Sequence, residues 1–512
     1  MLKKIYFILP FLLTAFLVNS QVVINEYSAS NFDSHLDNYG EYEDWVELYN
    51  TTNSDIDLNG WSLTDKPANL PKWSFTGSFI VSANSVAIIY CSGRDELVGG
   101  VAHTNFKITQ TKAGEVFVLS DASGNIIDSA RAIPAQKSHS RGRDVNGGSS
   151  WSVFTTATPN TSNTGAMLEY APLPIFSQSS GYYSAPFDLT LSCADPNAIL
   201  YYTTDGSKPD NSANLYTGPF NISSTSVVKA VAYSTNGLVP PSFIDYHTFF
   251  INDTHTVPIL SVSGDSVAVL IEDGLQNIGS WWNGTPHEPQ GTIEWFDKNG
   301  VLIDKGTGEF NKHGNDSWAY DQRGFDYVMR DQFGYNHALQ DKVFDTKSRE
   351  KFQRVIVKAA ANDNYPAAFG SSGGHIRDAY IHHLSQLADL RLDERSTKSC
   401  ILYLNGEYWG VYEMREKVDD HDFTDYYYDQ DKNNLQYLKT WGNTWIEYGG
   451  AQAQTDWDNL KNYITTNSMA NQANYQTVKS QYNTGSIIDY FLLNSYVVCG
   501  DWLNWNTAWW RG

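Results

Sequence analysis

Cysteine is scarce in this chain. Only 4 of the 512 residues are cysteine, which is too few for the disulfide framework that stabilises small secreted domains. Cys400 and Cys499 fall in the same expected domain and could pair in an oxidising compartment, whereas buried free thiols are an equally good interpretation. A disulfide-rich scaffold is therefore excluded. The length, with 41% hydrophobic residues, predicts a globular chain of roughly three domains.

Basic residues are also few for a chain of this length. Lysine and arginine total 35 against 57 aspartate and glutamate residues, so the net charge is -22. Proteins that bind nucleic acids neutralise the phosphates with clustered lysine and arginine. The composition therefore argues against a nucleic-acid partner. An anionic surface suits a secreted, soluble protein and can hold divalent cations.

Long hydrophobic runs are absent after the N-terminus. Residues 1–20 begin with two lysines after the first two residues, continue with an apolar run from Ile5 to Val18 and end in polar residues. This pattern is typical of a secretory signal peptide, and the apolar run is too short for a confident spanning helix. We therefore predict a signal peptide at 1–20 and a mature protein that is secreted or at the cell surface, without a stable membrane span. A retained N-terminal anchor is the alternative.

Short runs of alternating apolar and polar residues fill the segment 21–165. Tracts such as "VVINEYSAS", "DWVELYN" and "GEVFVLSD" alternate with period two and are separated by turn residues, which is typical of an all-β sandwich. The order of "INEYSASN" and "YEDWVELYNTTNSDIDLNGWSLTD" closely resembles that of lamin-tail domains. The resemblance implies an immunoglobulin-like sandwich.

A second β-rich segment spans 170–252 and follows a Thr/Asn/Ser-rich linker, "TTATPNTSNTG", whose composition favours an exposed connection. Its tract "YYTTDGSKP" predicts a strand and an Asp-Gly turn. The segment resembles the small immunoglobulin-like β-sandwich at the C-terminus of chitobiase-type enzymes, which is an accessory module there. We interpret Asp205 as a turn residue and not as a catalyst.

The segment 255–512 mixes strands with helical stretches such as "HIRDAYIHHLSQLADL", so we expect an α+β domain. In order, it predicts a hairpin with a polar turn, the strand "RVIVKAA", a helix at about 374–387 and a second hairpin. This is the order of elements in the N-lobe of a protein kinase. The expected fold is thus two all-β immunoglobulin-like sandwiches followed by an α+β protein-kinase-like domain with an incomplete C-lobe.

Near the end of the chain, Asp501 is followed five positions later by Asn506. Phosphoryl transfer needs a carboxylate that orients or deprotonates the attacking hydroxyl and a group that holds the metal on the phosphates. The catalytic loop of protein kinases has its Asp and Asn at this spacing. The spacing alone is a weak signal, and a helix cap or a turn in an aromatic loop is the alternative.

Several tracts of this segment together resemble the CotH (spore coat protein H) kinase family, a group of atypical secreted protein kinases. The most specific tract is "LNGEYWGVYEMREK", supported by "VIVKAAANDN", "IRDAYIHHL" and "IIDYFLLNSYVVCGDWLNWN". The resemblance makes Asp501 the catalytic aspartate and Asn506 a metal ligand. It also implies ATP and Mg2+ or Mn2+ as cofactors.

The resemblance suggests further nucleotide-binding residues. Lys358, on the strand "VIVK", would contact the phosphates, with Asp378 of "IRDAY" as its ion-pair partner. A strand lysine is as often a solvated edge residue. Arg323 is a competing cation, because it follows the polar turn that would cover the phosphates.

Two other parts of the expected nucleotide site depend more on backbone than on side chains. Gly314, Asn315 and Ser317 in the polar turn would approach phosphate oxygens, although such a turn is also an ordinary hairpin connection. Met414 to Lys417, including Glu416, would form the hinge beside the adenine.

A second metal-binding carboxylate is expected downstream of the catalytic loop, and the sequence ends at Gly512 without it. We therefore expect that this chain is a fragment, or else an inactive kinase fold. The leading hypothesis is a secreted kinase that transfers phosphate from ATP to hydroxyl side chains of extracellular or surface proteins, with the two sandwiches as accessory binding modules. The alternative is a non-catalytic adhesion or structural protein. Attachment to a cell-surface glycan is a third, weaker hypothesis.

Overall fold

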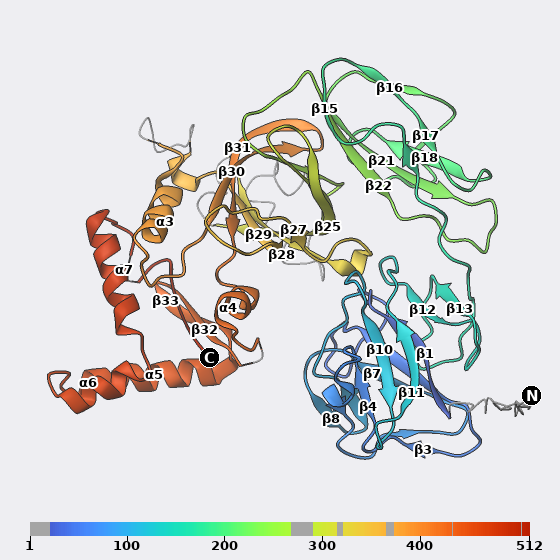
Figure 1. Ribbon diagram of the computed structural model, residues 1–512, viewed down its shortest axis with the longest axis horizontal. Coiled ribbons are helices and arrows are strands. Elements are labelled where there is room, and N and C mark those ends of the chain that lie inside the picture. Colours follow the sequence, from blue (N-terminus) through green and yellow to red (C-terminus); the bar gives the residue numbers. More distant parts are fainter. Residues whose placement is uncertain (1–20, 268–289, 315–320, 365–372, 433, 503) are drawn as a thin grey trace, which may run out of the picture. The chain divides into compact units, whose positions relative to one another are not determined.

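The computed structural model describes residues 21–267, 290–314, 321–364, 373–432, 434–502 and 504–512 (Figure 1). The chain divides into two compact units. The first runs up to Tyr170 and includes the short segments Leu238–Pro240 and Gln332–Gly334, and the second holds the rest of the chain. The predicted signal peptide lies outside the described residues.

The first unit is built from short strands. Their bounds are β1 (Val22–Ser28), β2 (Trp45–Asn50), β3 (Ile56–Asp57), β4 (Ser62–Thr64), β5 (Trp73–Ser74), β6 (Ile80–Val81), β7 (Val86–Tyr90), β8 (Glu96–Val98), β9 (Val101–His103), β10 (Val116–Ser120), β11 (Ile126–Arg131), β12 (Ser140–Arg143) and β13 (Trp151–Phe154). A seven-stranded sheet has the order β13-β12-β1-β2-β7-β9-β8, and a four-stranded sheet has the order β11-β10-β4-β5.

The two sheets of the first unit share one apolar core. Ile24 and Leu48 of the larger sheet and Leu63 and Phe117 of the smaller one are fully buried in the same cluster. Alternating side chains of each strand point to opposite faces of a sheet, so the apolar positions of the period-two pattern meet between the sheets. The expected all-β sandwich is present.

The second unit begins with another β-rich region. Its strands are β14 (Ile175–Phe176), β15 (Gly181–Tyr183), β16 (Phe187–Leu189), β17 (Leu191–Ser192), β18 (Ile199–Thr203), β19 (Asn214–Leu215), β20 (Phe220–Ile222), β21 (Ser226–Tyr233) and β22 (Asp245–Ile251). Five of them form a sheet in the order β15-β22-β21-β18-β19. Asp205 accepts a hydrogen bond from the backbone N–H of Ser207 at 3.1 Å, as expected of a turn residue.

A closed barrel follows in the same unit. Its strands are β23 (Ile259–Ser263), β24 (Gln290–Phe296), β25 (Leu302–His313), β26 (Gly324–Met329), β29 (Arg354–Lys358), β30 (Thr397–Leu404) and β31 (Glu407–Glu416), with the small pair β27 (Leu339–Gln340) and β28 (Lys351–Phe352) beside them. Their order around the barrel is β23-β24-β25-β26-β29-β31-β30. Closure comes from the parallel pairing of β23 with β30, while the other neighbours are antiparallel.

The two hairpins and the lysine-bearing strand occur in the predicted order, but the sequence did not predict that they belong to a closed barrel. The interior is filled by apolar side chains, among them Phe325, Val357, Tyr412 and Met414. Cys400 also lies in this core, and all four cysteines are free thiols.

The α-helices of the described residues follow the barrel strand β29. They are α3 (Arg377–Leu387), α4 (His421–Tyr428), α5 (Gly450–Thr466), α6 (Gln472–Lys479) and α7 (Thr484–Tyr496), and a three-stranded sheet joins β32 (Gln436–Trp441), β33 (Asn443–Tyr448) and β34 (Thr507–Arg511) in the order β33-β32-β34. In Figure 1 these elements are coloured from orange to red. The helix predicted at 374–387 is α3, which begins three residues later.

None of the helices in the described residues has the length and apolar character needed to cross a bilayer.

Close strand packing in the barrel generates a testable prediction at Gly308 of β25. A Cβ atom there would lie 2.1 Å from the carbonyl oxygen of Val328 on β26, so the backbone of one strand would have to move. Overpacking of this kind costs about 1–3 kcal/mol. We expect Gly308→Ala to lower the free energy of unfolding by this amount in chemical denaturation. Gly218→Ala is the control, because its Cβ would meet nothing within 4 Å. Equal stability of the two variants would contradict the prediction.

Candidate functional site

An ion pair joins the last residue of β29 to the first turn of α3. The Nζ atom of Lys358 lies 3.2 Å from Oδ2 of Asp378. The lysine side chain is 17% exposed and the aspartate side chain 53% exposed, so the pair lies at the edge of a buried region. This is the ion pair that the sequence predicted, although the contact by itself does not establish nucleotide binding.

The loop after β29 explains why the strand and the helix are aligned. Asp363 accepts hydrogen bonds from the backbone N–H groups of Gly374, at 2.7 Å, and Arg377, at 3.0 Å. Its carboxylate also pairs with the Arg377 side chain at 3.1 Å. A carboxylate at a helix N-terminus satisfies free N–H groups and favours the helix dipole. Asp363 therefore ties the start of α3 to the strand that carries Lys358.

The barrel wall next to Lys358 contributes a second basic residue. Along β31, Tyr412 and Met414 point into the barrel core, so Glu413 and Arg415 point to the outer face. Nη1 of Arg415 donates to Oδ2 of Asp378 at 2.9 Å, and its Nε donates to Oε2 of Glu413 at 3.0 Å. One oxygen of Asp378 therefore contacts both Lys358 and Arg415.

The charges of this cluster shift the ionisation of its members. Partial burial opposes ionisation of Asp378, but the charges of Lys358 and Arg415 outweigh it and hold the pKa of Asp378 well below its usual range. Burial lowers the pKa of Lys358, the charge of Asp378 opposes this, and Arg415 and Arg395 add to the lowering. Asp378 is therefore ionised at neutral pH.

A chain of further ion pairs continues from the barrel toward β32. Nδ1 of His313 lies 2.8 Å from Asp326, whose other oxygen accepts from Lys417 at 2.6 Å. Lys417 also lies 3.4 Å from Asp419, which pairs with Lys439 of β32 at 2.5 Å. Burial lowers the pKa of His313, so the alternating charges run from Asp326 of β26 through Lys417 and Asp419 to the sheet that follows the barrel.

Glu413, Asp419 and Asp326 were not predicted from the sequence, and Arg415 was expected only as part of the hinge at 414–417. A signal was present for part of this set. The period-two alternation of "YEMREK" places Glu413, Arg415 and Lys417 on one face of a strand, opposite the apolar positions.

The structure also brings together Asp501 and Asn506. The amide nitrogen of Asn506 donates to Oδ2 of Asp501 at 3.0 Å, in the segment between α7 and β34. Both residues are exposed. The contact agrees with a paired catalytic and metal-binding function and equally with an ordinary turn. In the described part of the chain, neither residue contacts Lys358, Asp378 or Arg415.

Arg323 and the predicted polar turn are only partly described. Arg323 is 5% exposed, directly before β26. Burial raises the pKa of Tyr412 in the barrel core, and the Arg323 charge opposes this. Gly314 follows β25 with a positive φ of 88°. Asn315 and Ser317 lie outside the described residues.

Met414 and Glu416 do not lie in a linker between two lobes, as the hinge hypothesis expected. Both belong to β31, where Met414 has neighbouring strands on both sides, opposite Val357 and Lys398. The Met414 side chain is in the barrel core, and Glu416 instead accepts from Tyr427 at 2.9 Å and lies 3.5 Å from Arg349. The backbone of Met414 is already paired with the neighbouring strands. This geometry therefore does not support binding of adenine by the Met414 backbone.

One group of residues in the described part of the chain has the spacing of a metal site. It consists of Asp420, His421 and Asp422 at the start of α4. Arg354 pairs with Asp420 at 3.2 Å, and Lys432 pairs with Asp422. These cations already balance the carboxylates, so the group is better explained as a helix start with ion pairs than as the predicted metal site.

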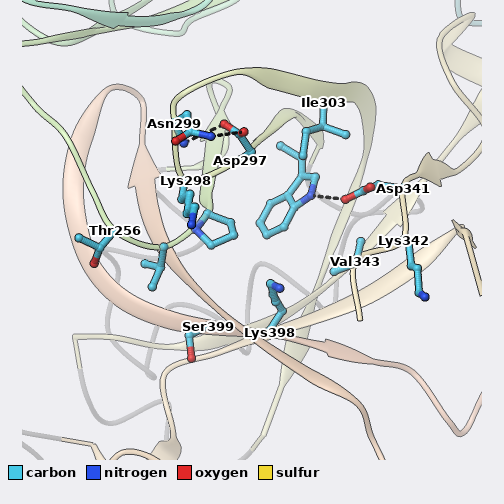
Figure 2. A pocket seen from close by; sticks show the side chains of 13 residues that line it. Thr256, Asp297, Lys298, Asn299, Ile303, Asp341, Lys342, Val343, Lys398 and Ser399 are labelled. Carbon is cyan, nitrogen blue, oxygen red and sulfur yellow. Dashed lines mark hydrogen bonds between the residues drawn. The ribbon is translucent and has the colours of Figure 1, made fainter. Parts of the chain in front are cut away.

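A surface hollow of about 570 Å3 opens on a different part of the barrel (Figure 2). Trp295 donates to Asp341 there at 2.9 Å, and Lys398 pairs with Asp345 at 2.7 Å. The residues that line it are Thr256, Val257, Pro258, Trp295, Asp297, Lys298, Asn299, Ile303, Asp341, Lys342, Val343, Lys398 and Ser399. None of them is a predicted site residue, so this hollow is not the predicted nucleotide site.

Comparison with known protein families finds three matches in the order predicted from the sequence. Residues 18–133 match the Lamin Tail Domain, residues 178–241 the Chitobiase/beta-hexosaminidase C-terminal domain, and residues 312–512 the CotH kinase protein family. No curated protein matches the chain. The three resemblances are confirmed.

The CotH match suggests a kinase-like protein and implies the use of ATP and a divalent metal in general. It includes Lys358, Asp378, Asp501 and Asn506. These residues fit such ligands: Lys358 offers an ammonium group whose carboxylate partner is largely exposed, and carboxylate and amide oxygens are the ligands that Mg2+ prefers.

The cluster formed by Lys358, Asp378, Glu413 and Arg415 generates a prediction for the pH dependence of stability. His382 lies one turn after Asp378 on α3, and burial together with the Arg395 charge lowers its pKa to about 4. In the unfolded chain His382 binds a proton near pH 6.5, whereas in the folded chain it does so only near pH 4. Between these values the unfolded state binds more protons, so the free energy of unfolding falls as the pH decreases. One such group contributes a slope of about 1.4 kcal/mol per pH unit at most. We expect His382→Gln to flatten the curve of unfolding free energy against pH over this interval.

The control for this prediction is the neighbouring His383, which is exposed. His383→Gln should leave the slope unchanged. A slope in His382→Gln as steep as that of the unmodified protein would show that the cluster does not suppress protonation of His382.

Proposed function

We propose that the C-terminal region is a phosphotransferase that moves the γ-phosphoryl group of ATP to a hydroxyl side chain of an extracellular or surface protein. The observation that carries this proposal is the ion pair between Lys358 at the end of β29 and Asp378 of α3, inside the region that matches the CotH kinase family. A kinase-like α+β arrangement places its phosphate-binding lysine on a strand and the partner acid on the following helix.

Each residue then has a defined task. Lys358 binds phosphate oxygens of the nucleotide through its ammonium group, and Asp378 holds that group in place. Asp501 accepts the proton of the attacking hydroxyl, whose oxygen forms the new P–O bond as the bond to the ADP leaving group breaks. Asn506 holds a divalent metal, Mg2+ or Mn2+, which neutralises phosphate charge when bound.

The remaining domains fit an accessory role in this proposal. Neither β-sandwich contributes a predicted catalytic residue, and the second resembles a module that is accessory in chitobiase-type enzymes. We propose that they attach the enzyme to a surface protein or a glycan after secretion. The proposed localisation rests on the N-terminal signal-peptide pattern.

The central test separates catalysis from nucleotide binding. Removal of a general base lowers the rate of such a reaction by about 10²–10⁴-fold. We expect Asp501→Asn to lose phosphate transfer to protein by this factor, with little change in the affinity for ATP, because Asp501 contacts the acceptor hydroxyl. The measurement is transfer of radiolabelled phosphate from ATP with Mg2+ or Mn2+, beside equilibrium binding of the nucleotide.

Asp458→Asn is the matched control, because this exposed carboxylate of α5 has no task in the proposal. Transfer that persists unchanged in Asp501→Asn would overturn the role of Asp501. Absence of nucleotide binding by the unmodified protein would instead favour the alternative function, a non-catalytic binding or adhesion protein.

A further inference from the structure

Lys358 and Glu413 are direct partners across the barrel ladder, yet they do not form an ion pair. The register between β29 and β31 places Lys358 opposite Glu413, and side chains of directly paired residues have Cβ atoms about 4.5–5.5 Å apart. Opposite charges at such positions normally pair. Instead, Lys358 contacts Asp378 of α3, and the contacts of Glu413 go to Arg415.

Arg415 is responsible for this choice of partners. Its Nε and Nη2 atoms both donate to Oε2 of Glu413, and its Nη1 donates to Asp378. The Arg415 side chain is 1% exposed and the Glu413 side chain 3% exposed. A buried carboxylate requires a cation or strong hydrogen-bond donors, and the guanidinium fork can satisfy Glu413 and Asp378 at the same time.

We propose that Arg415 is a positioning residue that keeps Glu413 away from Lys358 and fixes Asp378, so that Lys358 has only an exposed partner, which phosphate can replace. This inference rests on the proposed function, because it concerns how Lys358 stays available to the nucleotide. Arg415 itself need not touch the nucleotide.

The difference in burial gives the physical reason. An ion pair with Glu413 would be enclosed, and breaking a buried pair leaves an uncompensated charge. The pair with Asp378 is open to water on the aspartate side, and exposed pairs contribute little to stability. Exchange of Asp378 for a phosphate oxygen therefore requires less free energy than exchange of the enclosed Glu413 would.

The test must consider all charged groups around Lys358. These are Asp378 and His382 of α3, Glu413 and Arg415 of β31, His313 of β25, and Arg395, which precedes β30. Without Arg415, Lys358 loses a repulsive neighbour and Glu413 loses its partner. Both changes raise the pKa of Lys358. The loss of the repulsive neighbour does so without Glu413, whereas the release of Glu413 does so only if Glu413 is present.

The experiment compares Arg415→Met with the double variant Arg415→Met/Glu413→Gln. The first readout is the pKa of Lys358, measured by NMR after reductive ¹³C-methylation, with the signal assigned through Lys358→Arg. The second is the dissociation constant of unmethylated protein for a non-hydrolysable ATP analogue with Mg2+. In Arg415→Met we expect a raised pKa of Lys358 and at least a tenfold weaker affinity, and in the double variant a partial return of both, because Asp378 still lacks its contact with Arg415.

Arg330→Met is the matched control for a merely structural effect. Arg330 also pairs with a buried barrel carboxylate, Glu309, at 2.8 Å, and its loss should change neither readout. Arg415→Lys serves if Arg415→Met does not fold: a single ammonium cannot bridge both carboxylates, so both readouts should move in the same direction by a smaller amount.

Two results would overturn the inference: a pKa of Lys358 that is unchanged in Arg415→Met, or one that is the same in the single and double variants. Failure of the proposed function gives a different pattern. If the unmodified protein binds no nucleotide but the pKa of Lys358 still responds to Glu413, the positioning role stands and the nucleotide site is wrong.

Discussion

Closure of the barrel is the constraint on which the candidate site depends. A closed barrel has one interior, and its strands β29 and β31 fill it with Val355, Val357, Tyr412 and Met414. Because side chains alternate along a strand, the residues between them must lie on the outer wall. Lys358, Glu413 and Arg415 are therefore gathered on one face by the packing of the core, before any of their charges interact.

Burial of that wall then determines how the charges are arranged. Each buried charge needs a partner. Asp378, Arg415 and Glu413 form one group of ion pairs, and Asp326, Lys417 and Asp419 form another, which joins the barrel to the sheet after it through Lys439. Asp378 is the most exposed of these carboxylates.

Local patterns predicted the parts of the site that depend on single elements. Lys358 and Asp378 were predicted as partners from the resemblance to the CotH kinase family, and local patterns placed one on a strand and the other on the following helix. Barrel closure could not be predicted, because it pairs Ile259–Val262 with Ile401–Leu404, more than a hundred residues later. The position of Met414 and Glu416 within β31 could not be predicted for a related reason: nothing local shows that the strand continues to Glu416. The partner of Glu413 depends on a competition between two cations, which is decided only in three dimensions.

Asp378 has two functions that a more buried residue could not combine. Its Oδ2 atom holds both Lys358 and Arg415, which orients the two cations, while its exposed side keeps the pair weak enough to open. If the acid were enclosed, orientation would improve but an incoming anion would have to displace a buried pair. If Asp378 were absent, the charges of Arg415 and Arg395 would lower the pKa of Lys358 without the opposing effect of a carboxylate. A single carboxylate at the edge of the wall, fixed from behind by Arg415, satisfies both requirements.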